Sequence, residues 1–158
     1  LVESAKSGYW LSPELDIITD LNLFDELLGR LHLTVDDDTR RQLLKKAVEL
    51  YKSGPVENYS RELWFLPTVA HYNLRYAGAV NQLMEMMDQS GDYISILEYA
   101  NSARKNFPGN PDVLYWLVRA MRKLGMGEMA RNELRAARGI LSEEDYADLM
   151  KRLELTAQ

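Results

Sequence analysis

Apolar residues recur at steps of three or four along most of the chain, which is the spacing of one face of an α-helix. The first such stripe begins at Asp20, a residue type that caps helix N-termini, and the longest runs from Phe65 to Met87. Pro67 fits the first turn of that long helix, where its missing amide hydrogen costs nothing. Asp36–Asp38 offer a cap and first-turn carboxylates for another helix. The pattern predicts several amphipathic helices that share one core.

Residues 1–19 follow a different pattern. Tyr9 and Trp10 are strand-favouring residue types, and the pairs Ser7-Gly8 and Ser12-Pro13 are turn signals. This segment therefore predicts a short extended arm or hairpin rather than a helix.

A repeat runs through the second half of the chain. Gly91 and Gly125 lie 34 residues apart, and each follows a helical stripe. A glycine there permits the positive φ that closes a short turn between helices. The same shift relates three apolar pairs: Leu83 and Leu117, Met87 and Met121, Ala103 and Ala137.

A period of 34 residues is typical of the tetratricopeptide repeat, which is a pair of antiparallel helices. We therefore predict an all-α fold, a tetratricopeptide-like stack of antiparallel helix pairs that forms a right-handed α-solenoid over residues 20–158. The short extended arm of residues 1–19 precedes it. Ser142 and Asp145 resemble a capping box, which predicts a last helix that covers the end of the stack.

Composition narrows the function classes. The 158 residues carry a formal net charge of −5, so the chain as a whole lacks the basic excess that non-specific DNA binding needs. The absence of cysteine excludes disulfides and thiolate metal sites. The longest apolar stretch, residues 63–70, is far shorter than the roughly 20 residues that cross a bilayer. No export signal is visible, so we expect no membrane association and a cytoplasmic location.

No catalytic signature is present. The chain has neither a Gly-x-Ser-x-Gly nucleophile turn nor a glycine-rich phosphate loop, and its two histidines cannot form a histidine-rich metal site. We interpret His71 as a partly buried structural imidazole and His32 as a loop residue. The chain is therefore expected not to be an enzyme and to bind no cofactor or metal.

Two stretches and a tryptophan, in order, carry a resemblance to a known family. They are Asp20–Leu27 (DLNLFDEL), Ala47–Val56 (AVELYKSGPV) and Trp64, all ahead of the Gly91 repeat. This order resembles the bacterial transcriptional activator domain, as found C-terminal to a winged-helix domain in antibiotic-regulatory-protein-type activators. The run Ser7–Leu11 (SGYWL) is similar to the end of the last winged-helix hairpin. The resemblance implies that residues 1–19 are a remnant of a preceding DNA-binding domain.

Charge is unevenly distributed along the chain. Residues 104–138 carry +5, whereas residues 1–103 carry −7 and residues 139–158 carry −3. Within the basic segment, Arg131, Arg135 and Arg138 fall at helical spacing on one face. This stripe is either a solvated face or a landing surface for an acidic partner, a sister subunit or DNA phosphates.

By analogy with tetratricopeptide grooves, the first helix of each pair predicts a binding face. The candidate residues form one acidic and one basic wall: Asn81, Glu85 and Asp88, and Tyr115, Arg119 and Arg122. An equally open reading is that the stems of the basic residues only cover the neighbouring helix.

The function predicted from these patterns and the resemblance is protein–protein interaction or oligomerisation in a bacterial transcriptional regulator, linked to signal transduction. The partner would be a second copy, as in a homodimer, or the transcription machinery, and DNA would be contacted only through the missing winged-helix domain. The alternative is a stand-alone tetratricopeptide adaptor that binds a peptide or partner protein.

Overall fold

The structure, a computed structural model, describes residues 2–5, 8–11, 19–52 and 62–155. Two short strands precede the helices: β1 (Val2–Ala5) and β2 (Gly8–Leu11). Seven helices follow in the described residues: α1 (Asp20–Leu31), α2 (Asp37–Tyr51), α3 (Leu66–Gln89), α4 (Tyr93–Asn106), α5 (Pro111–Lys123), α6 (Gly127–Ala137) and α7 (Glu143–Leu155).

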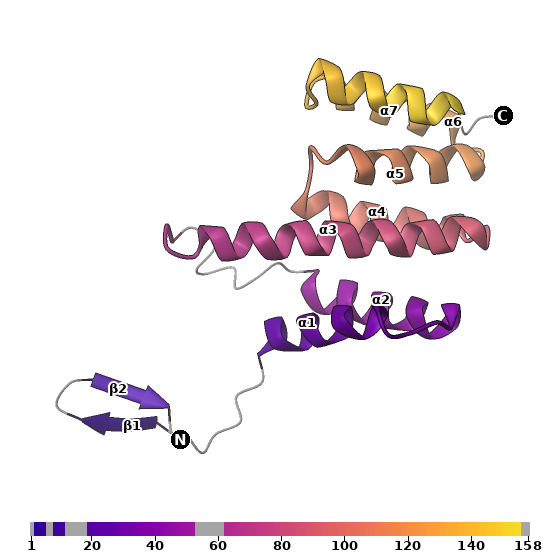
Figure 1. Ribbon diagram of the computed structural model, residues 1–158. Helices are drawn as coiled ribbons and strands as arrows, with labels where there is room; N and C mark the ends of the chain where they lie inside the picture. The colour runs from indigo at the N-terminus through magenta and orange to yellow at the C-terminus, as the bar shows by residue number, and fades with distance from the viewer. Residues whose placement is uncertain (1, 6–7, 12–18, 53–61, 156–158) are drawn as a thin grey trace.

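The helices form a stack of antiparallel pairs (Figure 1). Each helix from α1 to α5 packs against the next one along the chain, and α7 packs on α5 rather than on α6. The core runs through the whole stack, because Phe24, Leu83, Leu117 and Leu149 are each fully buried. The predicted tetratricopeptide-like fold is therefore confirmed.

The two turns that the 34-residue period predicts have matching geometry. Gly91 and Gly125 both adopt a positive φ, of 71° and 75°. The amide of Asp92 donates to the carbonyl of Met87 at 2.9 Å, and the amide of Met126 donates to that of Met121 at 2.8 Å. These bonds join equivalent positions and close both helix ends in the same way. The second unit, which departs more from the repeat pattern, therefore has the same turn as the first.

Helix starts agree with the sequence at α2 and differ by one residue at α1. Asp36 caps α2 by accepting a hydrogen bond from the Thr39 amide at 2.8 Å, as its sequence pattern predicts. At α1 the cap is Thr19 rather than Asp20. The Thr19 hydroxyl accepts from the Asn22 amide, and the Asn22 side chain accepts from the Thr19 amide, which satisfies two helix-end donors together. Asp20 lies in the first turn instead.

The last helix covers the end of the stack. Ser142 accepts a hydrogen bond from the Asp145 amide at 3.1 Å, which confirms the predicted capping contact. Leu149 and Leu153 of α7 are buried against the core, and Tyr146 and Met150 are half-buried. An end helix of this kind removes the apolar face that a terminal repeat would otherwise expose.

The arm contains an antiparallel hairpin. Strand β1 pairs with β2 in a register that places Val2 opposite Leu11 and Ala5 opposite Gly8. The rest of the predicted arm before residue 19, which is residues 1, 6–7 and 12–18 and includes Ser7 and the second turn signal, lies outside the described residues. Across the described part of the chain, no helix combines the length and apolar character that crossing a bilayer requires.

Candidate protein-binding surfaces

The predicted acidic and basic walls meet each other in the seam between α3 and α5. The Arg119 guanidinium donates two hydrogen bonds to the Asp88 carboxylate, at 2.7 and 2.9 Å. Only 14% of the Arg119 side chain and 21% of the Asp88 side chain are exposed, so water screens the pair weakly. The hydrogen bonds that Arg119 donates to Asp88 are the main cause of the raised pKa of Arg119. These two residues therefore join neighbouring repeats.

A second contact between α3 and α5 involves the side-chain amide of Asn81. The indole nitrogen of Trp116 donates to the side-chain oxygen of Asn81 at 2.7 Å. The Asn81 amide nitrogen in turn donates to Glu85 at 2.9 Å, one turn further along α3. A buried indole needs such an acceptor, because its N–H has lost its water partner. Asn81 thus has a structural partner on α5.

Tyr115 and Arg122 connect α5 to the last helix. Tyr115 is 7% exposed, and the guanidinium of Arg152 lies 4.3 Å from its ring centroid. Arg122 donates to the backbone carbonyl of Leu153 at 3.2 Å. Thus all six residues of the predicted acidic and basic walls have contacts within the chain. Their role in binding a partner stays a prediction.

The arginine stripe lies on the outer helix of the last pair. Arg131, Arg135 and Arg138 are all exposed on or directly after α6. Arg131 forms an ion pair with Glu128, one turn back on the same helix, and such exposed pairs contribute little to stability. In contrast to Arg119, these side chains do not link α6 to a neighbouring helix through any ion pair in the described residues. The stripe is therefore a surface feature.

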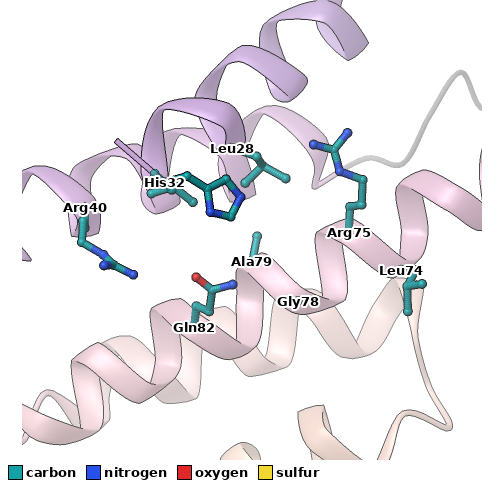
Figure 2. Close-up of a pocket in the computed structure, with 9 residues that line it drawn as sticks. Leu28, His32, Arg40, Leu74, Arg75, Gly78, Ala79 and Gln82 are labelled. Carbon is teal, nitrogen blue, oxygen red and sulfur yellow. The ribbon is translucent and has the colours of Figure 1, made fainter. Parts of the chain in front are cut away.

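A groove that the sequence did not reveal separates α1 from α3. It has a volume of about 500 Å³. Leu31 and Ala79 are buried and form its base, whereas Leu74 is 76% exposed at its edge. Leu28 and His32 reach from the α1 side toward α3 (Figure 2).

The rim of this groove, which we call the α1–α3 groove, is polar and cationic. His32, Arg40, Arg75 and Gln82 line it, and no acidic side chain does among the described residues. His32, expected to be a loop residue, is the exposed C-cap of α1. Its place beside Arg40 and Arg75 depends on how two helix pairs pack, which no local sequence pattern encodes.

Arg75 is held in position at one end of the groove. It forms an ion pair with Asp25 of α1, and the Tyr72 hydroxyl donates to the same carboxylate at 2.7 Å. That hydrogen bond is the main cause of the raised pKa of Tyr72. The Arg75 guanidinium also lies 5.9 Å from the ring centroids of Phe24 and Tyr72. These contacts preorganise one cation of the rim.

A second, smaller hollow of about 250 Å³ continues beyond the groove along α3. The two hollows share Arg40 and Gln82. The second one is lined by Asp37 and Glu85, so the charge reverses along the face.

The described residues also bear on the expectation of no metal site. They contain no group of three histidine, aspartate or glutamate side chains that could hold a metal ion. The interpretation of His71 as partly buried is wrong: the residue is exposed, and the contact of its ring is edge-on with Tyr72, with centroids 5.3 Å apart.

Paired helices, repeated glycine turns and a covering end helix define a helical-repeat protein of the tetratricopeptide-like class. Residues 19–155 match the family model described as the bacterial transcriptional activator domain. The chain therefore belongs to that family, and is a domain associated with transcriptional activators. No curated protein and no solved structure matches it.

Proposed function

We propose that this domain is a non-enzymatic protein-interaction module that supports transcription activation in the bacterial cytoplasm. Family membership over residues 19–155 is the single observation that supports this most strongly. DNA contact, in this proposal, belongs to a winged-helix domain upstream of the β1–β2 hairpin, and the helical stack adds no base recognition.

The arginine stripe on α6 is the proposed contact with a second copy or with the transcription machinery. The three side chains are exposed and lie on one face. The acidic N-terminal portion of a second copy would complement them, since residues 1–103 carry −7. Holding two protomers together raises the effective concentration of their DNA-binding domains at tandem sites.

The test is charge reversal in the intact regulator that carries this domain. Arg131→Glu, Arg135→Glu and Arg138→Glu, combined, should weaken self-association and reporter activation by about tenfold or more, because each change replaces an attraction by a repulsion. Sedimentation velocity measures assembly, and a promoter fusion measures activation.

A matched control carries the same change in charge elsewhere. Lys46→Glu, Lys123→Glu and Lys151→Glu alter three exposed lysines on α2, α5 and α7. This variant should stay within about twofold of the parent, as expected for scattered surface changes. Equal loss in both variants would point to net charge alone. Unchanged assembly and activation in the stripe variant would remove the stripe from the proposal and favour the adaptor alternative.

A further inference from the structure

We propose that the α1–α3 groove binds an extended acidic peptide segment of a partner protein. The inference rests on the proposed function only in assuming that the domain acts by binding proteins. It concerns a different surface from the α6 stripe and a defined chemistry of the occupant.

The charge of the rim selects an anionic occupant. His32, Arg40 and Arg75 border the groove, and no acidic residue lines it within the described part of the chain. Because Arg75 is already paired with Asp25, the charge available to an occupant is that of Arg40, and His32 and Gln82 add N–H donors beside it. Arg40 is half-buried and forms no ion pair with any described carboxylate. A guanidinium in a partly desolvated position gains most from a carboxylate that accepts two parallel hydrogen bonds. The occupant supplies that carboxylate.

The base of the groove selects apolar side chains next to the acid. Leu28 of α1 lies across from Ala79 of α3 (Figure 2), and Leu31 and Leu74 are the other leucines of the lining. Sites of this kind combine an apolar lining with a few placed polar groups. A leucine or similar side chain of the occupant would cover the exposed Leu74 and displace water from this surface.

Gly78 provides room for a close approach of the occupant's backbone. It lies in the middle of α3 and lines the groove, yet a Cβ there would meet nothing within 4 Å. Glycine weakens a helix interior relative to alanine, and no neighbouring group in the described chain requires it here. The vacant space above Gly78 is where a ligand backbone fits.

The length of the face matches a short extended chain. From Leu74 to Gln89, the two hollows follow α3 for about 22 Å at the helical rise per residue. A chain of about seven residues in the extended conformation spans this distance. Since Asp37 and Glu85 line the far end, the occupant carries its acidic residues beside His32 and Arg40 and a basic residue at the other end. The groove is open on one side, which suits a passing chain.

A random heptapeptide display library, panned on the 158-residue protein, tests this chemistry directly. The enriched peptides should combine at least one Asp or Glu with an adjacent large apolar residue. The most enriched peptide is then synthesised with a fluorescent label, and its Kd is measured by polarisation. Failure to enrich any sequence, or enrichment of sequences without acidic residues, overturns the proposal.

Groove variants locate the binding. Arg40→Glu should raise the Kd at least tenfold, and Gly78→Leu, which fills the space over the helix, should abolish saturable binding. Gly29→Leu is the matched control, because Gly29 is also a helical glycine with nothing within 4 Å of its Cβ, and it does not line the groove. It should stay within twofold of the parent. Thermal unfolding followed by circular dichroism shows that each variant is folded, and Arg40→Gln, a smaller change, should still weaken binding severalfold.

The outcome separates the two proposals. If the peptide binds Gly78→Leu as tightly as the parent, the groove is not its site and the present inference falls. The stripe variant of α6 should bind the same peptide normally. If the stripe variant loses activation and the parent protein binds no peptide, the proposed interaction function is supported and only the proposal for the α1–α3 groove is wrong.

Discussion

The α3–α5 seam and the α1–α3 groove lie on neighbouring helix pairs and use similar residue types in opposite ways. In the seam, Arg119 meets Asp88 and Trp116 meets Asn81. In the groove, Arg40 faces a hollow of about 500 Å³ without an acidic partner in its lining. Thus the same repeat architecture closes one junction with polar pairs, whereas the next has such a contact, Asp25 with Arg75 and Tyr72, at one end and a hollow beside it.

The difference shows how to separate structural from functional charges in a helical stack. Opposite charges on facing helices predict either an external ligand or a mutual pair, and only the three-dimensional arrangement decides between them. At Arg119 the partner is internal, so its removal should affect stability. Arg40 forms no ion pair with a described carboxylate, although Asp37 and Glu85 line the second hollow with it, so its removal should affect binding more than stability.

The largest expected effect is at the tryptophan of the seam. Trp116→Ala should lower the free energy of unfolding by about 3–5 kcal/mol, because it removes a buried aromatic side chain and leaves Asn81 without its donor. Urea denaturation measures the change. Trp64→Ala is the control: that side chain is 71% exposed and should contribute less than about 0.5 kcal/mol. Similar losses at both tryptophans would mean that the seam is not closed as described.

A smaller effect is expected from the Asp88–Arg119 pair. Asp88→Ala or Arg119→Ala alone should cost about 1–3 kcal/mol, since each removes one member of a poorly solvated ion pair. A double-mutant cycle should give a coupling of about 1 kcal/mol or more. The exposed pair Glu49–Lys52 serves as comparison and should couple by at most about 0.5 kcal/mol. Equal couplings would remove the distinction between a closed seam and an ordinary surface.

The smallest effect, and one of opposite sign, is expected in the groove. Gly78→Ala should raise the free energy of unfolding by about 0.5–1 kcal/mol, because alanine favours the helix and its Cβ meets open space. Gly91→Ala should instead lower it by about 1–2 kcal/mol, since the turn holds φ at 71°. Thermal melts of the two variants should shift in opposite directions. A destabilised Gly78→Ala variant would show that the space over α3 is already filled.

Features that depend on one turn of backbone could be predicted from the sequence. The glycine turns, the Asp36 cap and the Ser142 contact each follow from a local residue preference. The 34-residue period in addition predicted that the two glycine turns join equivalent helix pairs. The cap of α1 was displaced to Thr19 because the Asn22 side chain completes a reciprocal pair that a scan for single capping residues does not weigh.

The candidate sites were harder to predict than the fold. The sequence correctly placed charged residues on facing helices, but it could not show that Asp88 and Arg119 pair with each other. The α1–α3 groove could not be predicted from the sequence, because it is formed by residues of α1, α2 and α3 that are far apart in the chain, such as His32 and Gln82. Its one local signal is Gly78, a glycine inside a long helix without a turn to explain it.

The neighbour-to-neighbour contacts of the stack have a mechanical consequence. Since α1 to α5 each pack on the next helix along the chain and α7 packs on α5, we expect bending of the stack to be shared among several helix junctions. A small change of angle at each junction between neighbouring helices adds up from the first helices of the stack to the last. We therefore expect the distance between the two ends of the stack to change without the loss of any single helix–helix contact.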